Sequence, residues 1–390
     1  MAVFRTERQS GGGATGRAGA VERHSPVRDP GPIKQKAREL GFELAGIAAP
    51  GPTLEALFYP QWLEQGYHGA MSYLAGRRGE LRADARSLLP SARSVICLGM
   101  VYNSPDPYST EFESKEEGWI SRYAWGEDYH GVLQARLREL ADWIRGSYGS
   151  GVECKACVDT SPLLERAYAR RAGLGWIGKN CCLIDEQLGS WLFLGEILTS
   201  LELETDDERP YRCGTCSRCI DACPTNALVE VGADTGPSHA LDSRRCISYW
   251  TIELRESIPD EHREAVGPHV FGCDICQDVC PWNSPRRAAS SAEPAFAPAN
   301  ATPRLEDLAS LSAEEFNARF AGSPIERSRY AGFLRNVAVA MGNSGNPSFR
   351  EALERLAGCG QPLVREHAEW ALAQLGRKAR EEGEEQGAAE

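Results

Sequence analysis

The sequence has no apolar run of the roughly 18–20 residues that a helix needs to cross a bilayer. Residues 1–30 have few large apolar side chains and several glycines, so they do not resemble a secretory signal and are expected to be disordered. Basic charge is also scarce, since 43 Lys and Arg stand against 55 Asp and Glu, a net charge of −12. We therefore expect a cytoplasmic protein without a membrane anchor, and any nucleic-acid contact should depend on a local basic patch.

A nicotinamide-binding signature is missing as well. No G-x-G-x-x-G stretch opens a helix between residues 31 and 200, so no nicotinamide site is evident there. The length of 390 residues leaves room for two or three domains. A hydrophobic content of 42% and a charged content of 25% are ordinary for a globular protein.

Cysteine, in contrast, is abundant. Nine of the 14 cysteines fall between Cys182 and Cys280 of a long chain without an export signal, which favours metal ligation over disulfides. The run "CGTCSRCIDACP", which starts at residue 213, has the spacing C-x2-C-x2-C-x3-C-P of bacterial ferredoxins. This spacing indicates electron transfer through iron–sulfur clusters.

A second run, "CDICQDVCP", repeats this motif from residue 273 but lacks its first cysteine, because Val270 stands in that position. Cys246 lies between the runs and brings the number of candidate cysteine ligands to the eight that two clusters need. In two-cluster ferredoxins the last cysteine of each run ligates the other cluster. The sequence thus predicts two [4Fe–4S] clusters, one held by Cys213, Cys216, Cys219 and Cys280, the other by Cys223, Cys246, Cys273 and Cys276. The alternative is a pair of zinc sites, whose usual cysteine spacings differ.

The remaining cysteines predict no site. Cys154 and Cys157 form a C-x-x-C pair on an expected strand, where they would point to opposite faces. The other four are most simply apolar core residues: Cys97, Cys181, Cys182 and Cys359.

The order of elements predicts an α+β protein with three folded parts. Residues 31–202 should form an α/β domain, with helices near 33–41, 128–149 and 162–172 and strands near 42–50, 91–103, 152–160 and 190–200. Ser161 is expected to cap the third helix, with Pro162 at its first position. Residues 203–290 should form a ferredoxin-like domain with both clusters and 291–376 a HEAT-like helical repeat domain; 377–390 is an acidic tail.

Several stretches together resemble the epoxyqueuosine reductase family: "VDTSPLLERAYARRAGLGWIGKN", "GSWLFLGEILT", "CISYWTIELR" and "LRNVAVAMGNSGN". The resemblance extends from about residue 31 to 376. It implies an enzyme that uses cobalamin and two [4Fe–4S] clusters to remove the epoxide oxygen of epoxyqueuosine at the wobble position of tRNA. It also implies a monomer, with a low-potential electron donor such as a flavodoxin or ferredoxin and tRNA as partners. In this reading the α/β domain binds the cobalamin.

By the same resemblance, Asp159 is the proton donor. A donor at neutral pH needs a raised pKa, for which an apolar pocket and the bulky corrin are the expected causes. Further contacts to the corrin or the nucleotide are expected from matching stretches: Arg82, His130, Lys179, Asn180 and Ser248. The residues alone leave plainer roles open, since Asp159 could be a surface turn residue and His130 a hydrogen-bonded residue at a helix start.

Two further features bear on these expectations. "DYHGVL" departs from the cobalt-ligating pattern D-x-H-x-x-G at Leu133, so no histidine is expected below the metal. Contacts to the tRNA are expected from arginines and aromatic residues that suit phosphates and unpaired bases: Arg286, Arg287, Arg327, Arg329, Tyr330, Phe333 and Arg335.

Two other functions compete with this reading. The first is a cytoplasmic, cobalamin-dependent reductive dehalogenase that acts on a small molecule, although a twin-arginine export signal is missing and a HEAT-like tail is present. The second is a non-catalytic electron-transfer protein, which would leave Asp159 and the α/β domain without a role.

Overall fold

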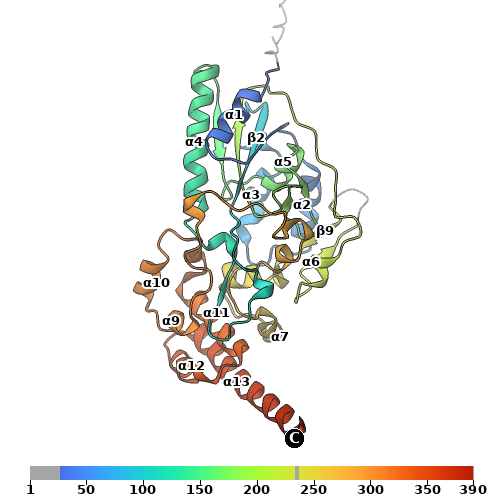
Figure 1. Cartoon of the computed structure of the whole chain (residues 1–390). Helices are drawn as coiled ribbons and strands as arrows, with labels where there is room; N and C mark the ends of the chain where they lie inside the picture. The colour runs from blue at the N-terminus through green and yellow to red at the C-terminus, as the bar shows by residue number, and fades with distance from the viewer. Residues whose placement is uncertain (1–26, 233–236, 390) are drawn as a thin grey trace, which may run out of the picture.

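A four-stranded antiparallel sheet forms the centre of the first half of the chain. The computed structural model describes residues 27–232 and 237–389 (Figure 1). The strand order is β1-β2-β7-β4, and every neighbouring pair runs antiparallel. The strands, all predicted from the sequence, are β1 (Leu44–Ala48), β2 (Ser94–Val101), β7 (Leu192–Thr199) and β4 (Cys154–Cys157).

Helices cover both faces of this sheet. On one face lie α1 (Gly31–Glu39) and α4 (Tyr129–Tyr148), whose apolar residues at helical spacing, among them Leu133, Leu137 and Ile144, are fully buried. On the other face lies α5 (Glu165–Arg171). Shorter elements complete this part: α2 (Leu54–Glu64), α3 (Gly76–Leu81), β5 (Trp176–Ile177) and β6 (Leu183–Ile184).

The predicted start of α5 is wrong. The helix begins at Glu165 rather than at Pro162, and Ser161 does not cap it, because Leu164 takes the cap position without a side-chain hydrogen bond. The carbonyl of Ser161 instead accepts a hydrogen bond from the amide of Leu163 at 2.8 Å, so the chain turns before the helix starts. As a result, Asp159 lies in a loop between β4 and α5.

The cysteine-rich segment contains few regular elements. The short helices α6 (Arg218–Asp221) and α8 (Ile275–Asp278) each carry one cysteine of a run and pack against each other. A hairpin and a third short helix lie between them: β8 (Leu228–Glu230), β9 (His239–Leu241) and α7 (Asp260–Arg263). Val270, which replaces a cysteine of the second run, is fully buried in β10 (His269–Phe271).

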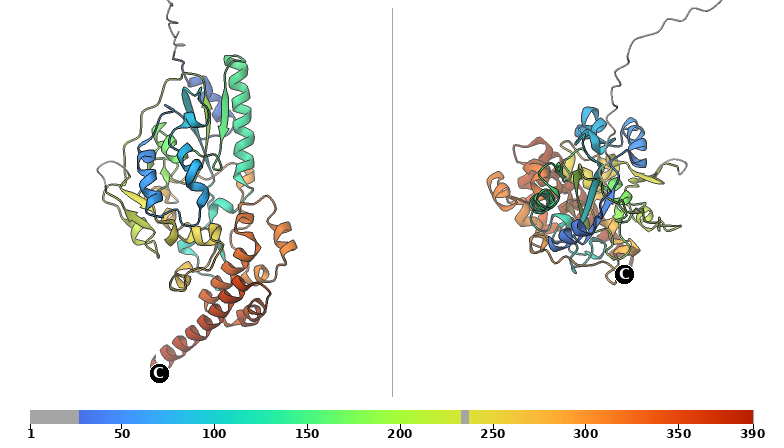
Figure 2. Two further views of the ribbon diagram at one scale, coloured as in Figure 1. Left: turned by 180° about the vertical axis from the view of Figure 1, so that it is seen from behind. Right: turned by 90° about the horizontal axis from the view of Figure 1, so that it is seen from above.

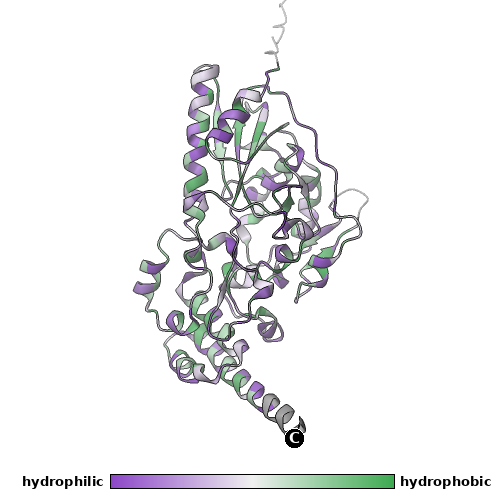
Figure 3. Ribbon diagram, in the orientation of Figure 1, coloured by the Kyte–Doolittle hydropathy of each residue, from purple (hydrophilic) through white to green (hydrophobic). Residues whose placement is uncertain are grey.

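The C-terminal helices extend away from the sheet as a separate lobe (Figures 1 and 2). They are α9 (Leu305–Ala309), α10 (Ala313–Arg319), α11 (Arg329–Ser344), α12 (Arg350–Ala357) and α13 (Pro362–Ala389). Their apolar faces share one core with β10 and its parallel partner β3 (Trp119–Ile120) (Figure 3). This part therefore depends on the rest of the chain for its core, and α13 continues through the segment expected to be an acidic tail.

The N-terminal segment and possible membrane-spanning helices were also subjects of sequence predictions. The expected disordered segment 1–30 falls mostly outside the described residues, but Arg28, within it, pairs with Leu203 in an isolated bridge. None of the helices described here is long and apolar enough to span a membrane.

Arg335 is a structural residue, contrary to the prediction that it contacts tRNA. The residue is 1% exposed, and its guanidinium donates to the carbonyl oxygens of Leu254, Glu256 and Trp250. These carbonyls belong to the segment that follows Cys246, so Arg335 joins α11 to the cysteine-rich part. Burial lowers its pKa to about 9.

Arg335→Met should destabilise the protein by about 3 kcal/mol or more, because it leaves buried carbonyl groups without donors. The exposed Arg329 supplies a matched control, and Arg329→Met should stay within about 0.5 kcal/mol of the wild type. Urea unfolding followed by circular dichroism measures both changes. Equal midpoints for the two variants would show that the buried hydrogen bonds of Arg335 contribute little.

Candidate active site

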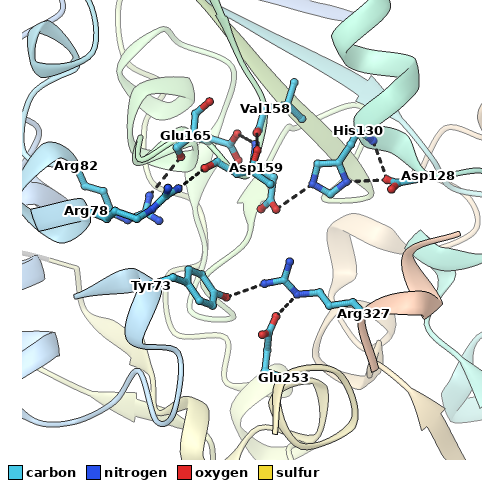
Figure 4. Close-up of polar contacts among 12 residues, drawn as sticks. Tyr73, Arg78, Arg82, Asp128, His130, Val158, Asp159, Glu165, Glu253 and Arg327 are labelled. Atoms are coloured by element: carbon cyan, nitrogen blue, oxygen red, sulfur yellow. Dashed lines mark hydrogen bonds and ion pairs between the residues drawn. The ribbon is translucent and has the colours of Figure 1, made fainter. Parts of the chain in front are cut away.

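Asp159 stands in a strained loop at the end of β4. Its φ of 37° lies in the left-handed region, which side-chain-bearing residues adopt rarely, although Asp more than most. The loop is held from several sides: the amide of Asp159 donates to the carboxyl of Glu165, and Arg78 donates to the carbonyl of Thr160 at 2.6 Å (Figure 4). The side chain of Asp159 remains 46% exposed. A strained yet well-held carboxylate of this kind fits a functional position.

His130 connects Asp159 to the start of α4. Its Nε2 lies 3.1 Å from Oδ2 of Asp159, and its Nδ1 lies 2.7 Å from Oδ1 of Asp128, the N-cap residue of the helix. Burial alone would lower the pKa of His130, but the hydrogen bonds and charges of the two carboxylates outweigh it and raise the pKa to about 9. At neutral pH the imidazole is therefore charged, and each ring nitrogen donates to one aspartate.

The pKa of Asp159 is lowered, which corrects the expectation of a raised value. Burial would raise it, but the hydrogen bond from His130 and the positive charges of His130, Arg327 and Arg82 dominate. Asp159 is thus a carboxylate paired with an imidazolium at neutral pH. The proton of this pair resides on His130.

Two further carboxyl groups, one half-buried and one fully buried, lie behind the loop, and no sequence pattern singled them out. Burial, together with the negative charge of Asp159, raises the pKa of Glu165 to about 8. Glu196 on β7 is fully buried, neither of its carboxyl oxygens has a hydrogen-bond partner among the described residues, and burial raises its pKa well above the ordinary value.

Arg327 and Tyr73 lie opposite this pair (Figure 4), and the charge of Arg327 acts on Asp159. Arg327, which precedes α11, donates from Nε to the carboxylate of Glu253 at 2.5 Å and from Nη2 to the hydroxyl of Tyr73 at 3.1 Å. The guanidinium also lies 5.5 Å from the centre of the Tyr73 ring. The C-terminal helices, the cysteine-rich segment and the first domain therefore meet at one site.

The stability of the protein should depend on pH through the imidazolium of His130. Its folded pKa is raised, so its contribution is complete below the ordinary value of about 6.5 and is lost as the pH rises through about 9. After allowance for partial exposure, the free energy of unfolding should fall by about 1–2 kcal/mol over this interval. Thermal unfolding between pH 6.5 and 9 measures the fall, and His130→Gln should make it shallower. An equally steep fall in the variant would rule out the histidine as its source.

The eight predicted cluster cysteines lie in two neighbourhoods, here called the first and second quartets, although no group of three or more His, Cys, Asp or Glu side chains among the described residues is arranged to hold a single metal ion. In the first, burial and the nearby thiols of Cys280, Cys213 and Cys216 together raise the pKa of Cys219 to about 11. In the second, burial and the nearby thiols of Cys246 and Cys223 raise the pKa of Cys273. All 14 cysteines are free of disulfides. Two groups of four free thiols are a donor set that fits two [4Fe–4S] clusters.

Lys179, Asn180 and Ser248 lie beside these cysteines. Lys179 and Asn180 line a cavity of about 270 Å³ around the first quartet. The amide of Asn180 donates to the carbonyl of Cys276 at 3.4 Å, and Ser248 contacts the thiol of Cys246. Lys179 and Asn180 thus lie at the first quartet, and their contact with the corrin or the nucleotide stays a prediction.

The expected tRNA contacts divide into exposed and buried residues. Arg327 and Arg329 are exposed, whereas Phe333 is fully buried in the core of the C-terminal helices and, like Arg335, does not face an RNA. Tyr330 is half-buried and donates to the carbonyl of Leu311 at 2.7 Å. Arg286 and Arg287 are exposed, and Arg287 lines the cavity of the first quartet.

Arg82 has a feature that suits an anionic or amide-bearing cofactor next to Asp159. The residue is 5% exposed, its Nη1 lies 3.4 Å from the carbonyl of Ser161, and its Nε has no partner among the described residues. A buried guanidinium nitrogen without an acceptor is costly unless a bound group supplies one. Arg82 therefore remains a candidate for cofactor binding.

Comparisons with known proteins agree with this geometry. A family model described as epoxyqueuosine reductase QueG matches residues 82–160, and a 4Fe-4S double cluster binding domain matches residues 212–283. The epoxyqueuosine reductase of Xanthomonas campestris is 40% identical over 362 residues, which cover 91% of this chain and 99% of the relative. That of Pseudomonas aeruginosa is 42% identical over 356 residues, which cover 90% and 96%.

Solved structures show the same similarity. An epoxyqueuosine reductase with an epoxyqueuosine-modified tRNA stem loop has a TM-score of 0.78 at 30% identity, covering 89% of this chain and 90% of that one. The Bacillus subtilis epoxyqueuosine reductase, solved with its catalytic loop swung out of the active site, has a TM-score of 0.77 at 29% identity and covers 88% and 90%.

Proposed function

Because this chain belongs to the epoxyqueuosine reductase family, we propose that it reduces epoxyqueuosine to queuosine at the wobble position of tRNA. The observation that carries the proposal is the His130–Asp159 ion pair, which lies opposite Arg327 at the meeting point of all three parts of the chain. The enzyme is an oxidoreductase, and we place it in the cytoplasm as a monomer.

The reaction needs both electrons and protons. Conversion of an epoxide to an alkene consumes two electrons and two protons and releases one water. The two quartets would hold two [4Fe–4S] clusters, which would supply the electrons one at a time. Cobalamin, when bound, supplies a metal centre of low potential next to the substrate. Arg82, with its unpartnered Nε, would hold this cofactor together with the neighbouring Arg78.

The protein's own task is to deliver a proton to the oxygen that leaves. The proton is held on Nε2 of His130, 3.1 Å from Oδ2 of Asp159. Its transfer along this hydrogen bond produces a neutral imidazole and a carboxylic acid, and Asp159 then donates to the oxygen. In this account Asp159 is the proton donor, as expected from the sequence, and His130 refills it. A raised resting pKa for Asp159 is then unnecessary.

The remaining parts position the RNA. Arg327 lies at the site and suits contact with a phosphate next to the flipped nucleoside. One solved relative holds an epoxyqueuosine-modified tRNA stem loop, which supports an anticodon stem loop as the bound RNA. We propose that α11, α12 and α13 form a HEAT-like unit that carries this arginine to the site.

A bacterial strain without its own epoxyqueuosine reductase tests the proposal. Such a strain accumulates epoxyqueuosine in its tRNA, and expression of this chain should replace it with queuosine in the digested nucleosides. Persistent epoxyqueuosine, despite soluble protein with both clusters, would overturn the assignment. A dehalogenase-like reductase would give that result and would instead reduce a halogenated aromatic compound.

A further inference from the structure

The cavity of the first quartet opens on positively charged side chains. Four cations line it, and no acidic side chain does so among the described residues. We call them the basic rim: Lys179, Arg212, Arg218 and Arg287. The basic rim thus concentrates positive charge on a chain whose net charge is −12.

The basic rim is accessible to a partner. Arg212, Arg218 and Arg287 are exposed, and Lys179 is partly exposed. Arg218 has no ion-pair partner among the described residues, whereas Arg212 lies 3.3 Å from the carboxylate of Glu186. Accessible cations that are only partly neutralised attract an anionic surface.

Aromatic side chains add to this surface. Arg287 lies 5.0 Å from the ring centre of Trp282, and Trp282 packs edge-on against Trp176 at 5.0 Å. Tyr211, next to Arg212 in the chain, is 49% exposed. Arginine and aromatic residues are the types enriched at protein–protein interfaces.

The second quartet has a different environment. Cys246 and Cys273 pack against a hydrophobic cluster that includes Trp250, Ile258 and Val339, and none of the four cysteines of this quartet lines the cavity behind the basic rim. The first quartet, in contrast, lies in the cavity behind the basic rim. A carrier that docks on the rim therefore faces the first quartet and not the second.

We propose that the basic rim is the docking surface of an acidic, one-electron carrier protein of the flavodoxin class. The proposal rests on the proposed function in one respect, namely that the first quartet binds a [4Fe–4S] cluster. A carrier docked on the rim brings its redox group over this cluster, and charge complementarity raises the rate of productive encounter.

The electron balance is simple. In each encounter the anionic hydroquinone of the carrier is oxidised to its neutral semiquinone, and the first cluster gains the electron that is released. Two encounters supply the two electrons that convert the epoxide to the alkene. The protons for the released water come from solution through the active site and not from the carrier.

An RNA is the other anionic partner that could contact the rim. The tRNA must bring its wobble nucleoside to Asp159, where Arg327 already provides a cation at the opposite wall. The rim instead surrounds the cysteines, so we assign it to the electron donor and treat RNA binding there as an outcome of the test.

The test measures electron transfer from a purified bacterial flavodoxin to the reconstituted enzyme with both clusters. Stopped-flow absorbance follows the oxidation of the flavodoxin hydroquinone between about 50 and 500 mM salt. Arg212→Glu and Arg218→Glu should each lower the second-order rate constant about tenfold at low salt and make its salt dependence shallower. Arg365→Glu, which reverses an exposed charge on α13, should stay within about twofold of the wild type.

Two further measurements separate the possible outcomes. Dithionite should reduce the clusters, and drive tRNA turnover, equally well in the wild type and in both rim variants. If the proposed function is wrong, dithionite-driven turnover of tRNA fails in the wild type as well, whereas the flavodoxin rates still test the docking surface. Flavodoxin rates equal to those of the wild type in both variants would overturn the docking surface. If the rim variants bind an anticodon stem-loop RNA more weakly but keep the wild-type flavodoxin rates, the rim is a tRNA contact. This result would also overturn its assignment as the docking surface of the electron carrier.

Discussion

Asp159→Asn is expected to lower the single-turnover rate of epoxyqueuosine reduction at least about 100-fold, with both clusters and cobalamin still bound. The amide keeps the size of the carboxylate and its contact with His130 but cannot accept a proton from the imidazolium and pass it on. Loss of a positioned proton donor typically costs 10²- to 10⁴-fold in rate. Quenched single turnovers with nucleoside mass spectrometry measure this rate.

A second readout separates proton transfer from a structural role of Asp159. One of the two carboxylates that raise the pKa of His130 is lost in the variant, so this pKa should fall. Asp142→Asn, at an exposed position on α4 where Asp142 pairs with Arg145, is the matched control and should leave the rate unchanged. A wild-type rate in Asp159→Asn would remove Asp159 as the proton donor.

Cys276→Ser should reduce the bound iron from about eight to about four atoms per chain and abolish turnover. A serine hydroxyl is a poor substitute for a thiolate, and the second cluster is the one that should pass electrons to the active site. The control is Cys359→Ser, since Cys359 lies outside both quartets, and it should keep full iron content and activity.

Iron analysis and low-temperature electron paramagnetic resonance, before and after reduction, provide the measurement. The spectrum of Cys276→Ser should show a single reduced cluster instead of two interacting ones. Eight iron atoms in this variant would contradict the assignment of the second quartet.

The sheet and the double-cluster segment could be predicted from the sequence because their signals are local or carry a fixed spacing. Buried strands such as Ser94–Val101 are continuous apolar runs, and α4 repeats its apolar residues at helical intervals. The exchange of the last cysteine between runs places Cys223 with Cys246 and Cys280 with Cys213, and the structure has the same neighbours.

The electrostatics of the active site could not be predicted in the same way. Asp159 meets His130 across 29 positions of the chain, and Arg327 meets Tyr73 across 254. The pKa of a carboxylate depends on such distant neighbours. The expectation of a raised pKa for Asp159 is wrong because the imidazolium of His130 lies beside it and lowers this pKa. Likewise, the arginine-rich stretch around α11 gave no sign that Arg335 is buried while Arg327 and Arg329 are exposed.

Anaerobic incubation of the purified enzyme tests the central claim most directly. The assay contains the reconstituted protein with both clusters, cobalamin, dithionite and tRNA that carries epoxyqueuosine, and mass spectrometry of the digested nucleosides follows the reaction. The account predicts that the modified nucleoside loses one oxygen atom and becomes queuosine. Unchanged epoxyqueuosine, with clusters and cobalamin demonstrably bound, would contradict it.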